Sequence, residues 1–347
     1  MAQLAYSRAD LTKSHVYARP HEEAGYRLHG GFIEGGEYVS PRTLMRTPAV
    51  RAWADALFAR GFPLIDCSRA ILVADTYPNR EQQKLLLGSD LGQTLWDSLT
   101  RTGVIEARGG ALCNVPVPDF QQIFVEDVSQ MAVGHLHKGL LWAHGADEAG
   151  DPDNRDLGAH DKMWFACRDM VFGKNAYPRP DVPQSISRPA AAARELPMLP
   201  PQFEQLIKFM MNILMIEVRA ENFFDFCRDV FVDPDNFKDK RIEADKARII
   251  VERIRRDEMI HVGYLQASLS EMRALTFKTE GGKTQAGAEI IDPLWEKIKA
   301  WPDAETRALT RKTTRETIEV QAIARLGEGD ARALLAKFDA LASAPKA

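Results

Sequence analysis

The sequence has few cysteines, and none of them form a metal-binding pair. Its four cysteines, Cys67, Cys113, Cys167 and Cys227, are scattered along 347 residues without a Cys-x-x-Cys motif. This spacing excludes a zinc ribbon and a small disulfide-stabilised scaffold. Because unpaired cysteines are typical of a reducing compartment, we expect a cytoplasmic protein.

Long apolar runs and an excess of positive charge are also missing. The most apolar stretch, residues 209–218, contains Asn212 and Glu217 and is too short to span a bilayer. The N-terminus does not follow a basic segment with an apolar one, so we predict no signal peptide. The net charge of −4 and the pI of about 6.1 argue against nucleic acid or an anionic membrane surface as partners.

What the sequence does contain is helical periodicity in four segments, at residues 120–144, 160–172, 203–232 and 242–275. Seven of the nineteen prolines fall within residues 173–202, which excludes a helix there and predicts a long crossing connection. We therefore predict a mainly α protein whose core, residues 116–275, is a bundle of four helices.

The regions on either side of this core are predicted to be smaller units. Residues 1–115 are expected to form an irregular α+β lobe, with a glycine-rich hairpin at 28–41 and short helices at 47–60, 80–87 and 91–100. Residues 276–347 are expected to form a helical extension, with helices at 294–301, 303–326 and 331–341.

The fourth core segment carries two polar residues where apolar ones are expected. Its buried stripe is formed by apolar side chains, namely Ala247, Ile250, Val251, Ile254, Val262, Leu265, Leu269 and Met272. Glu258 and His261 fall inside this stripe, one turn apart on the same side of the helix. A buried Glu-x-x-His pair is the spacing with which helical bundles hold two metal ions.

The third core segment repeats this anomaly with Glu217 and Glu221, which share an otherwise apolar face. An isolated buried carboxylate is costly and needs a cation, a metal or a shifted pKa. Glu217 precedes the turn between the two helices by nearly the same distance as Glu258 follows it. In an antiparallel hairpin, Glu217 and Glu221 should therefore meet Glu258 and His261.

The ligands expected from the first two core segments are less sharply defined. His135 and His160 each lie on an apolar helix face and are the preferred candidates. Glu126 and His137 are the alternatives, on the opposite side of the predicted helix at 120–144. Together with the acids, these residues favour iron or manganese over structural zinc.

The segment Arg256-Asp-Glu-Met-Ile-His261, preceded by Glu217-Val-Arg-Ala-Glu221, resembles the second half of the ferritin-like di-iron carboxylate proteins. The resemblance implies a ferritin-like four-helix bundle with Glu258 and His261 at the Glu-x-x-His positions and Glu221 or Glu217 at the lone-Glu position. The first half departs from the pattern, because neither 120–144 nor 160–172 contains Glu-x-x-His.

The resemblance implies a non-haem di-iron oxygenase or oxidoreductase. It would use two iron ions, with manganese as the alternative, O₂ and a small organic or tethered metabolic substrate. Its catalytic residues and substrate are not defined by any motif. Two other interpretations stay open: one subunit of a multicomponent oxygenase that receives electrons from a partner protein, and a metal-free structural or assembly protein whose acids pair with Arg253, Arg255 or Arg256. A homo-oligomer is compatible with each of them.

Overall fold

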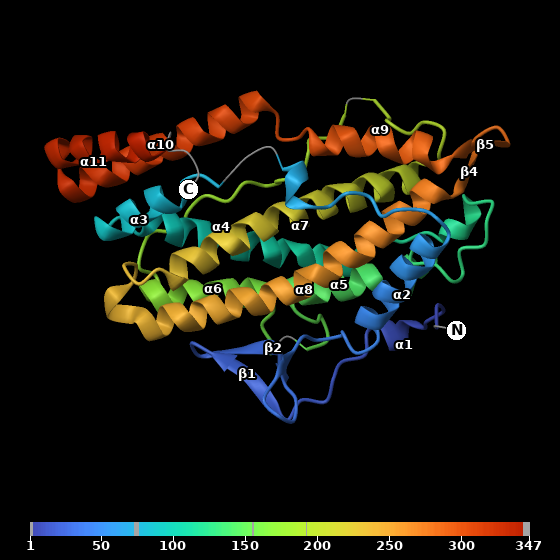
Figure 1. Cartoon of the computed structure of the whole chain (residues 1–347), viewed down its shortest axis with the longest axis horizontal. Helices are drawn as coiled ribbons and strands as arrows, with labels where there is room; N and C mark the ends of the chain where they lie inside the picture. The colour runs from blue at the N-terminus through green and yellow to red at the C-terminus, as the bar shows by residue number, and fades with distance from the viewer. Residues whose placement is uncertain (1–2, 73–75, 155, 192, 343–347) are drawn as a thin grey trace.

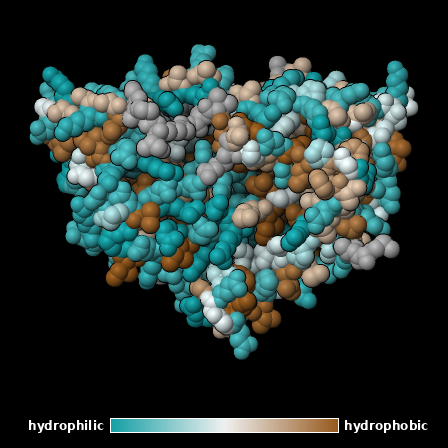
Figure 2. Space-filling model, viewed as in Figure 1, coloured by the Kyte–Doolittle hydropathy of each residue, from teal (hydrophilic) through white to brown (hydrophobic). Residues whose placement is uncertain are grey.

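The computed structural model describes residues 3–72, 76–154, 156–191 and 193–342. The protein is mainly helical, as predicted, with two small antiparallel sheets (Figure 1). No described helix combines the length and the apolar character needed to cross a bilayer. Figure 2 shows a face dominated by hydrophilic side chains, with smaller hydrophobic areas between them.

The two longest helices, α7 (Pro201–Val232) and α8 (Arg241–Ala274), form an antiparallel hairpin along the whole molecule (Figure 1). Their bounds confirm the predicted segments at 203–232 and 242–275. The prolines before residue 202 stop any earlier start, and Pro201 occupies the first turn of α7, where its missing N–H costs nothing. The 3₁₀ turn η5 (Lys238–Lys240) closes the hairpin.

Helix α6 (His160–Phe172) packs on α8 and matches its predicted bounds. Helix α4 (Gln93–Gly109) lies on the other side of α6 and is longer than the predicted segment at 91–100. It continues because Gly103 lets α4 approach α6 closely; a Cβ there would lie 2.6 Å from the Phe165 ring. The extension brings Glu106 into the helix.

The prediction of one continuous helix at 120–144 is wrong. The chain forms the 3₁₀ turns η3 (Phe120–Gln122) and η4 (Val133–Lys138), and the helix α5 begins only at Leu140 and ends at Ala149. Polar side chains bond the backbone between these turns. The Asp127 carboxylate accepts the N–H of Ser129, and the Gln121 side-chain oxygen accepts the N–H of Val128. Such bonds compete with the helical ladder.

The N-terminal lobe contains α1 (Arg8–Leu11), a three-stranded sheet and α2 (Arg46–Ala59). Strands β1 (Arg19–Glu23), β2 (Tyr26–Phe32) and β3 (Tyr38–Val39) pair antiparallel in that order, which confirms the predicted hairpin. Gly35 and Gly36 turn the chain with positive φ angles. Strand β2 lies against α6, so the sheet reaches the centre of the molecule.

The hydrophobic core is divided along α8 into two clusters. One contains the α8 residues from Ala244 to Ile254 with α4, α6 and the second half of α7; the other contains those from Tyr264 to Met272 with α2, α5 and the first half of α7. Between them, α8 buries only polar side chains, Asp257, Glu258 and His261. The polar section is therefore enclosed by apolar packing at both ends.

The remaining elements cover one edge of the core. These are η1 (Arg69–Ile71), α3 (Arg80–Gly88), η2 (Gly110–Asn114), the hairpin of β4 (Thr276–Thr279) and β5 (Lys283–Ala286), α9 (Gly287–Lys299), α10 (Ala304–Leu326) and α11 (Glu328–Leu341). The helices confirm the predicted C-terminal extension, and α9 begins earlier than expected. Helices α10 and α11 pack on α3 through a third cluster centred on Phe338.

Replacing Phe338 with Ala should destabilise the protein by about 3–5 kcal/mol, because it empties the fully buried centre of the third cluster. Leu309→Ala on the exposed side of α10 is the control and should change the free energy of unfolding by less than about 0.5 kcal/mol. Urea unfolding of both variants measures the difference. Equal effects would contradict the packing of α10 and α11 on α3.

Candidate metal centre

Five helices place seven ionisable side chains in the polar section of the core. Helix α4 contributes Glu106, α5 contributes His144 and Glu148, α6 contributes His160, α7 contributes Glu217, and α8 contributes Glu258 and His261. All except the half-buried Glu106 are buried. They form two groups, each with ligand atoms within 4.8 Å of one another: His144, Glu148, Glu217 and His261, and Glu106, Glu148, His160 and Glu258.

Glu148 belongs to both groups because one of its oxygens faces three imidazoles. Its Oε1 lies 3.4 Å from Nε2 of His144, 3.5 Å from Nδ1 of His160 and 3.2 Å from Nδ1 of His261. Neither Glu148 Oε1 nor His160 Nδ1 has a well-aligned hydrogen bond among the described residues, although charged groups surround both. Buried polar atoms without a partner are rare and point to an ion or water between them.

Glu258 joins the two groups from the opposite side. Its Oε1 lies 3.0 Å from Nδ1 of His160, and its Oε2 lies 2.7 Å from Nδ1 of His261. Glu217 on the neighbouring helix reaches Nε2 of His144 at 3.1 Å. Glu217 and Glu258 lie close enough to influence each other electrostatically, in agreement with their equal heights in the predicted hairpin.

The second nitrogen of each imidazole is fixed by a separate polar group. Nε2 of His160 lies 3.1 Å from Oδ2 of Asp257, and Nε2 of His261 lies 3.1 Å from Oδ2 of Asp147. Nδ1 of His144 lies 2.9 Å from the Tyr264 hydroxyl. Partners of this kind set the tautomer and ring orientation of metal-binding histidines.

Asp147 is in turn held by two arginines of the N-terminal lobe. Nε of Arg42 donates to Asp147 Oδ1 at 2.9 Å, and Nη2 of Arg46 donates to Asp147 Oδ2. Arg46 is fully buried. On the other side of the centre, Nε2 of His29 on β2 lies 3.3 Å from Oδ2 of Asp257. The N-terminal lobe thus supports both aspartates that orient histidines.

The carboxylates of the cluster are buried and lie close together, and both conditions shift their pKa values. Burial raises the pKa of Glu217 well above its usual range, and the negative charge of Glu258 adds to the shift. Burial would also raise the pKa of Glu148, but hydrogen bonds from neighbouring carboxyl and imidazole groups hold it well below normal. Burial opposes charge on His160 and His261, yet attraction to Glu258 raises the pKa of both well above normal. A cation would relieve this repulsion.

Four of the residues proposed from sequence lie in the cluster: His160, Glu217, Glu258 and His261. His135 does not; its Nε2 accepts the backbone N–H of Tyr6, and its ring packs on Trp53. Glu221 also lies outside, in an ion pair with Arg255 at 2.7 Å. The alternatives Glu126 and His137 are likewise outside it, since Glu126 binds Thr276 and His137 is exposed.

Glu106, His144 and Glu148 were missed by the sequence analysis. The available signal was the dipeptide Asp147-Glu148, which repeats Asp257-Glu258. In both pairs the Glu faces the cluster while the Asp orients a histidine on another helix. The repeat was hidden because α5 ends directly after Glu148, and its histidine counterpart, His160, begins the next helix.

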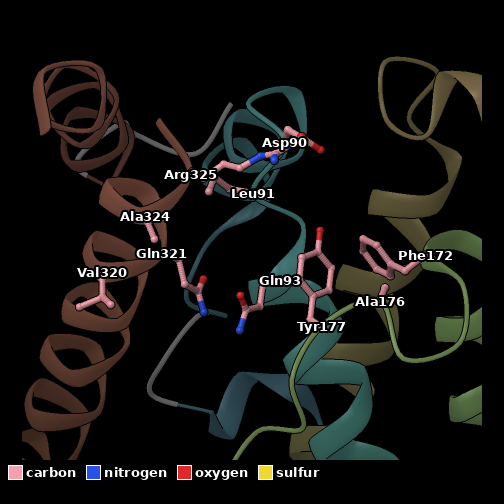
Figure 3. A pocket seen from close by; sticks show the side chains of 10 residues that line it. All are labelled: Asp90, Leu91, Gln93, Phe172, Ala176, Tyr177, Val320, Gln321, Ala324 and Arg325. Carbon is pink, nitrogen blue, oxygen red and sulfur yellow. Dashed lines mark hydrogen bonds and ion pairs between the residues drawn. The ribbon is translucent and has the colours of Figure 1, made fainter. Parts of the chain in front are cut away.

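A cavity of about 590 Å³ lies elsewhere, between α10, the start of α4 and the end of α6 (Figure 3). Figure 3 shows the amides of Gln93 and Gln321 and the ring of Tyr177 around it. None of its lining residues belongs to the cluster of acids and histidines.

Comparisons with protein-family models, with curated proteins and with solved structures found no match for this chain.

Asp147→Asn should destabilise the protein by about 3–5 kcal/mol, because two buried guanidinium groups lose their carboxylate. Asp55→Asn, which changes a surface pair with Arg51, is the matched control and should cost under about 1 kcal/mol. Chemical unfolding monitors both. Adding Arg42→Gln to Asp147→Asn should recover part of the loss, and a further additive loss would refute the buried pairing.

Proposed function

We propose that this protein binds two divalent metal ions, iron or manganese, and is an O₂-dependent oxidoreductase of the ferritin-like di-iron type. One ion would be held by Glu106, Glu148, His160 and Glu258, and the other by His144, Glu148, Glu217 and His261. Glu148 is common to both sets, and the acids and imidazoles offer only oxygen and nitrogen ligands, which suit these metals.

The observation that carries the proposal is the charge of the centre. In the part of the chain that the structure describes, two arginines, Arg42 and Arg46, pair with a cluster of six carboxylates, namely Glu106, Asp147, Glu148, Glu217, Asp257 and Glu258. In the metal-binding state, with the histidines neutral and all six carboxylates ionised, four negative charges remain in a section closed by apolar packing at both ends. Two divalent cations neutralise this charge, and uncompensated charges at such depth are very costly.

The histidines support the same conclusion. Each of the three turns one nitrogen toward the acids while its second nitrogen is hydrogen-bonded by Asp257, Asp147 or Tyr264. Burial lowers the pKa of His144 to about 4, which keeps this imidazole neutral and able to bind a cation. Three imidazole nitrogens lie within 3.5 Å of one carboxylate oxygen, and a bound cation would displace the protons from those that are protonated.

Bound in the reduced state, two such ions would supply the capacity to bind O₂ and transfer electrons to it. The chain's own residues then have three tasks. Asp147 and Asp257 keep His261 and His160 in one orientation, and the hydrophobic clusters exclude water. The Tyr264 hydroxyl orients His144 and is the nearest phenolic O–H to it. A small organic or tethered substrate and an electron-donor protein complete the proposed reaction.

Purified protein should carry about two iron or manganese ions per chain, measured by elemental analysis. The double substitution Glu258→Ala and His261→Ala should reduce this to less than about one tenth, because it removes ligands of both sets. Glu221→Ala, one helical turn beyond Glu217, and His135→Ala should retain two ions.

Reactivity is tested with protein loaded with Fe²⁺ under anaerobic conditions and then mixed with O₂. Rapid oxidation of the iron and O₂ uptake are expected for the unsubstituted chain and for Glu221→Ala, but not for the double variant. Folded protein that contains no metal and cannot be loaded would overturn the proposal. It would favour the structural or assembly alternative, in which buried acids serve to pair with arginines such as Arg42.

A further inference from the structure

A small cavity on the outer side of α7 gathers three positively charged side chains. It has a volume of about 130 Å³ and lies where α9 ends and α10 begins, along the edge of the core (Figure 1). Its lining includes three cations, an aromatic ring and two apolar side chains, namely Arg219, Lys299, Arg307, Trp301, Leu72 and Met215. Arg219 follows Glu217 by two positions, which places it about 200° around the helix from that acid.

The positive charges of this cavity are compensated only in part, because Lys299 interacts electrostatically with Asp66 and Arg307 with Asp303, while Arg219 has no such partner among the described residues. Among the described residues, no carboxylate lies within ion-pair distance of Arg219 or Arg307, and Lys299 pairs only with Glu296, at 2.6 Å on an exposed surface. Each arginine donates to a single backbone carbonyl, Arg219 to that of Trp301 and Arg307 to that of Pro302. Most of their N–H groups are left for another acceptor.

Arg219 differs in this respect from other sheltered arginines of the protein. Arg42 pairs with Asp147, and Arg188 pairs with Glu195 through two hydrogen bonds. Arg219 is half-buried without such a partner, and burial lowers its pKa to about 10. A sheltered guanidinium that lacks a counter-charge costs free energy, which a bound anion would recover.

We propose that this cavity binds a small oxyanion, a carboxylate or phosphate group. The Arg219 and Arg307 guanidinium groups would hold it by charge-assisted hydrogen bonds, for which arginine is well suited, with Lys299 adding positive charge. The rings and apolar groups of Trp301, Met215 and Leu72 would receive the carbon part of an organic acid. The volume of about 130 Å³ is the size of one such small group.

This site is separate from the proposed metal centre, because it lies on the opposite side of α7 and shares no residue with it. Its test therefore does not depend on metal binding. Isothermal titration of the full chain with benzoate, benzamide and inorganic phosphate separates the sources of the anion. Binding of benzoate without benzamide identifies an organic acid, whereas binding of phosphate alone identifies a free oxyanion.

Arg219→Gln and Arg307→Gln should each weaken binding of the effective anion about tenfold or more, because each removes hydrogen bonds to a charged group. Arg311→Gln is the matched control; it lies one turn further on α10, with its guanidinium over the Tyr77 ring, and should leave the affinity unchanged. Raising the salt concentration should weaken binding in parallel.

The unfolding midpoint provides a second measurement. Without added anion, Arg219→Gln should not lower the midpoint, because it removes an uncompensated charge. With anion, the unsubstituted chain and Arg311→Gln should gain thermal stability, and Arg219→Gln should not. The proposal is overturned if neither benzoate nor phosphate binds, or if the Arg219 and Arg311 variants bind equally well.

Discussion

The cost of burying carboxylates in one dry section of the core is the constraint on which the rest of this structure depends. Two hydrophobic clusters lie on either side of that section along α8 and shield the acids between them from bulk water. The surrounding elements provide side chains that pair with these carboxylates. Arginines come from the N-terminal lobe, and imidazoles come from α5, α6 and α8.

The two halves of the centre support each other across the bundle. Asp147 on α5 orients His261 on α8, and Asp257 on α8 orients His160 on α6. In each case the adjacent glutamate faces the cluster, so one Asp-Glu dipeptide both contributes a carboxylate to the cluster and positions a histidine of the other half. Movement of α5 relative to α8 would disturb ligands on both helices at once.

The long helices and half of the centre could be predicted from sequence, because their signals are local. The apolar stripes of α6, α7 and α8 fix their faces, and Glu217, Glu258 and His261 stand out as polar residues within them. Helix α5 has no such stripe of its own. Its surroundings are buried on nearly every side, so periodicity could not separate it from the turns that precede it.

The errors share a physical origin in tertiary contacts. Glu106 was missed because close packing against α6 carries α4 beyond the point where local sequence suggests an end. His135 lies on an apolar face, as predicted, but its nitrogens are satisfied by the backbones of Tyr6 and Met131. Glu221 lies among apolar residues when α7 is considered alone. In the folded chain, Arg255 from α8 donates a hydrogen bond to its carboxylate.

The break between α5 and α6 has a consequence for the way in which the centre is held together. Glu148 and His160 lie on two different helices, so no single helix fixes the distance between them. The segment that joins the two helices contacts β2, where the carbonyl of Gly158 accepts the N–H of His29. An isolated helix could present Glu258 and His261 together at any time. The other half is held in place by contacts with the N-terminal sheet, so the complete centre brings together parts of the chain that are distant in sequence.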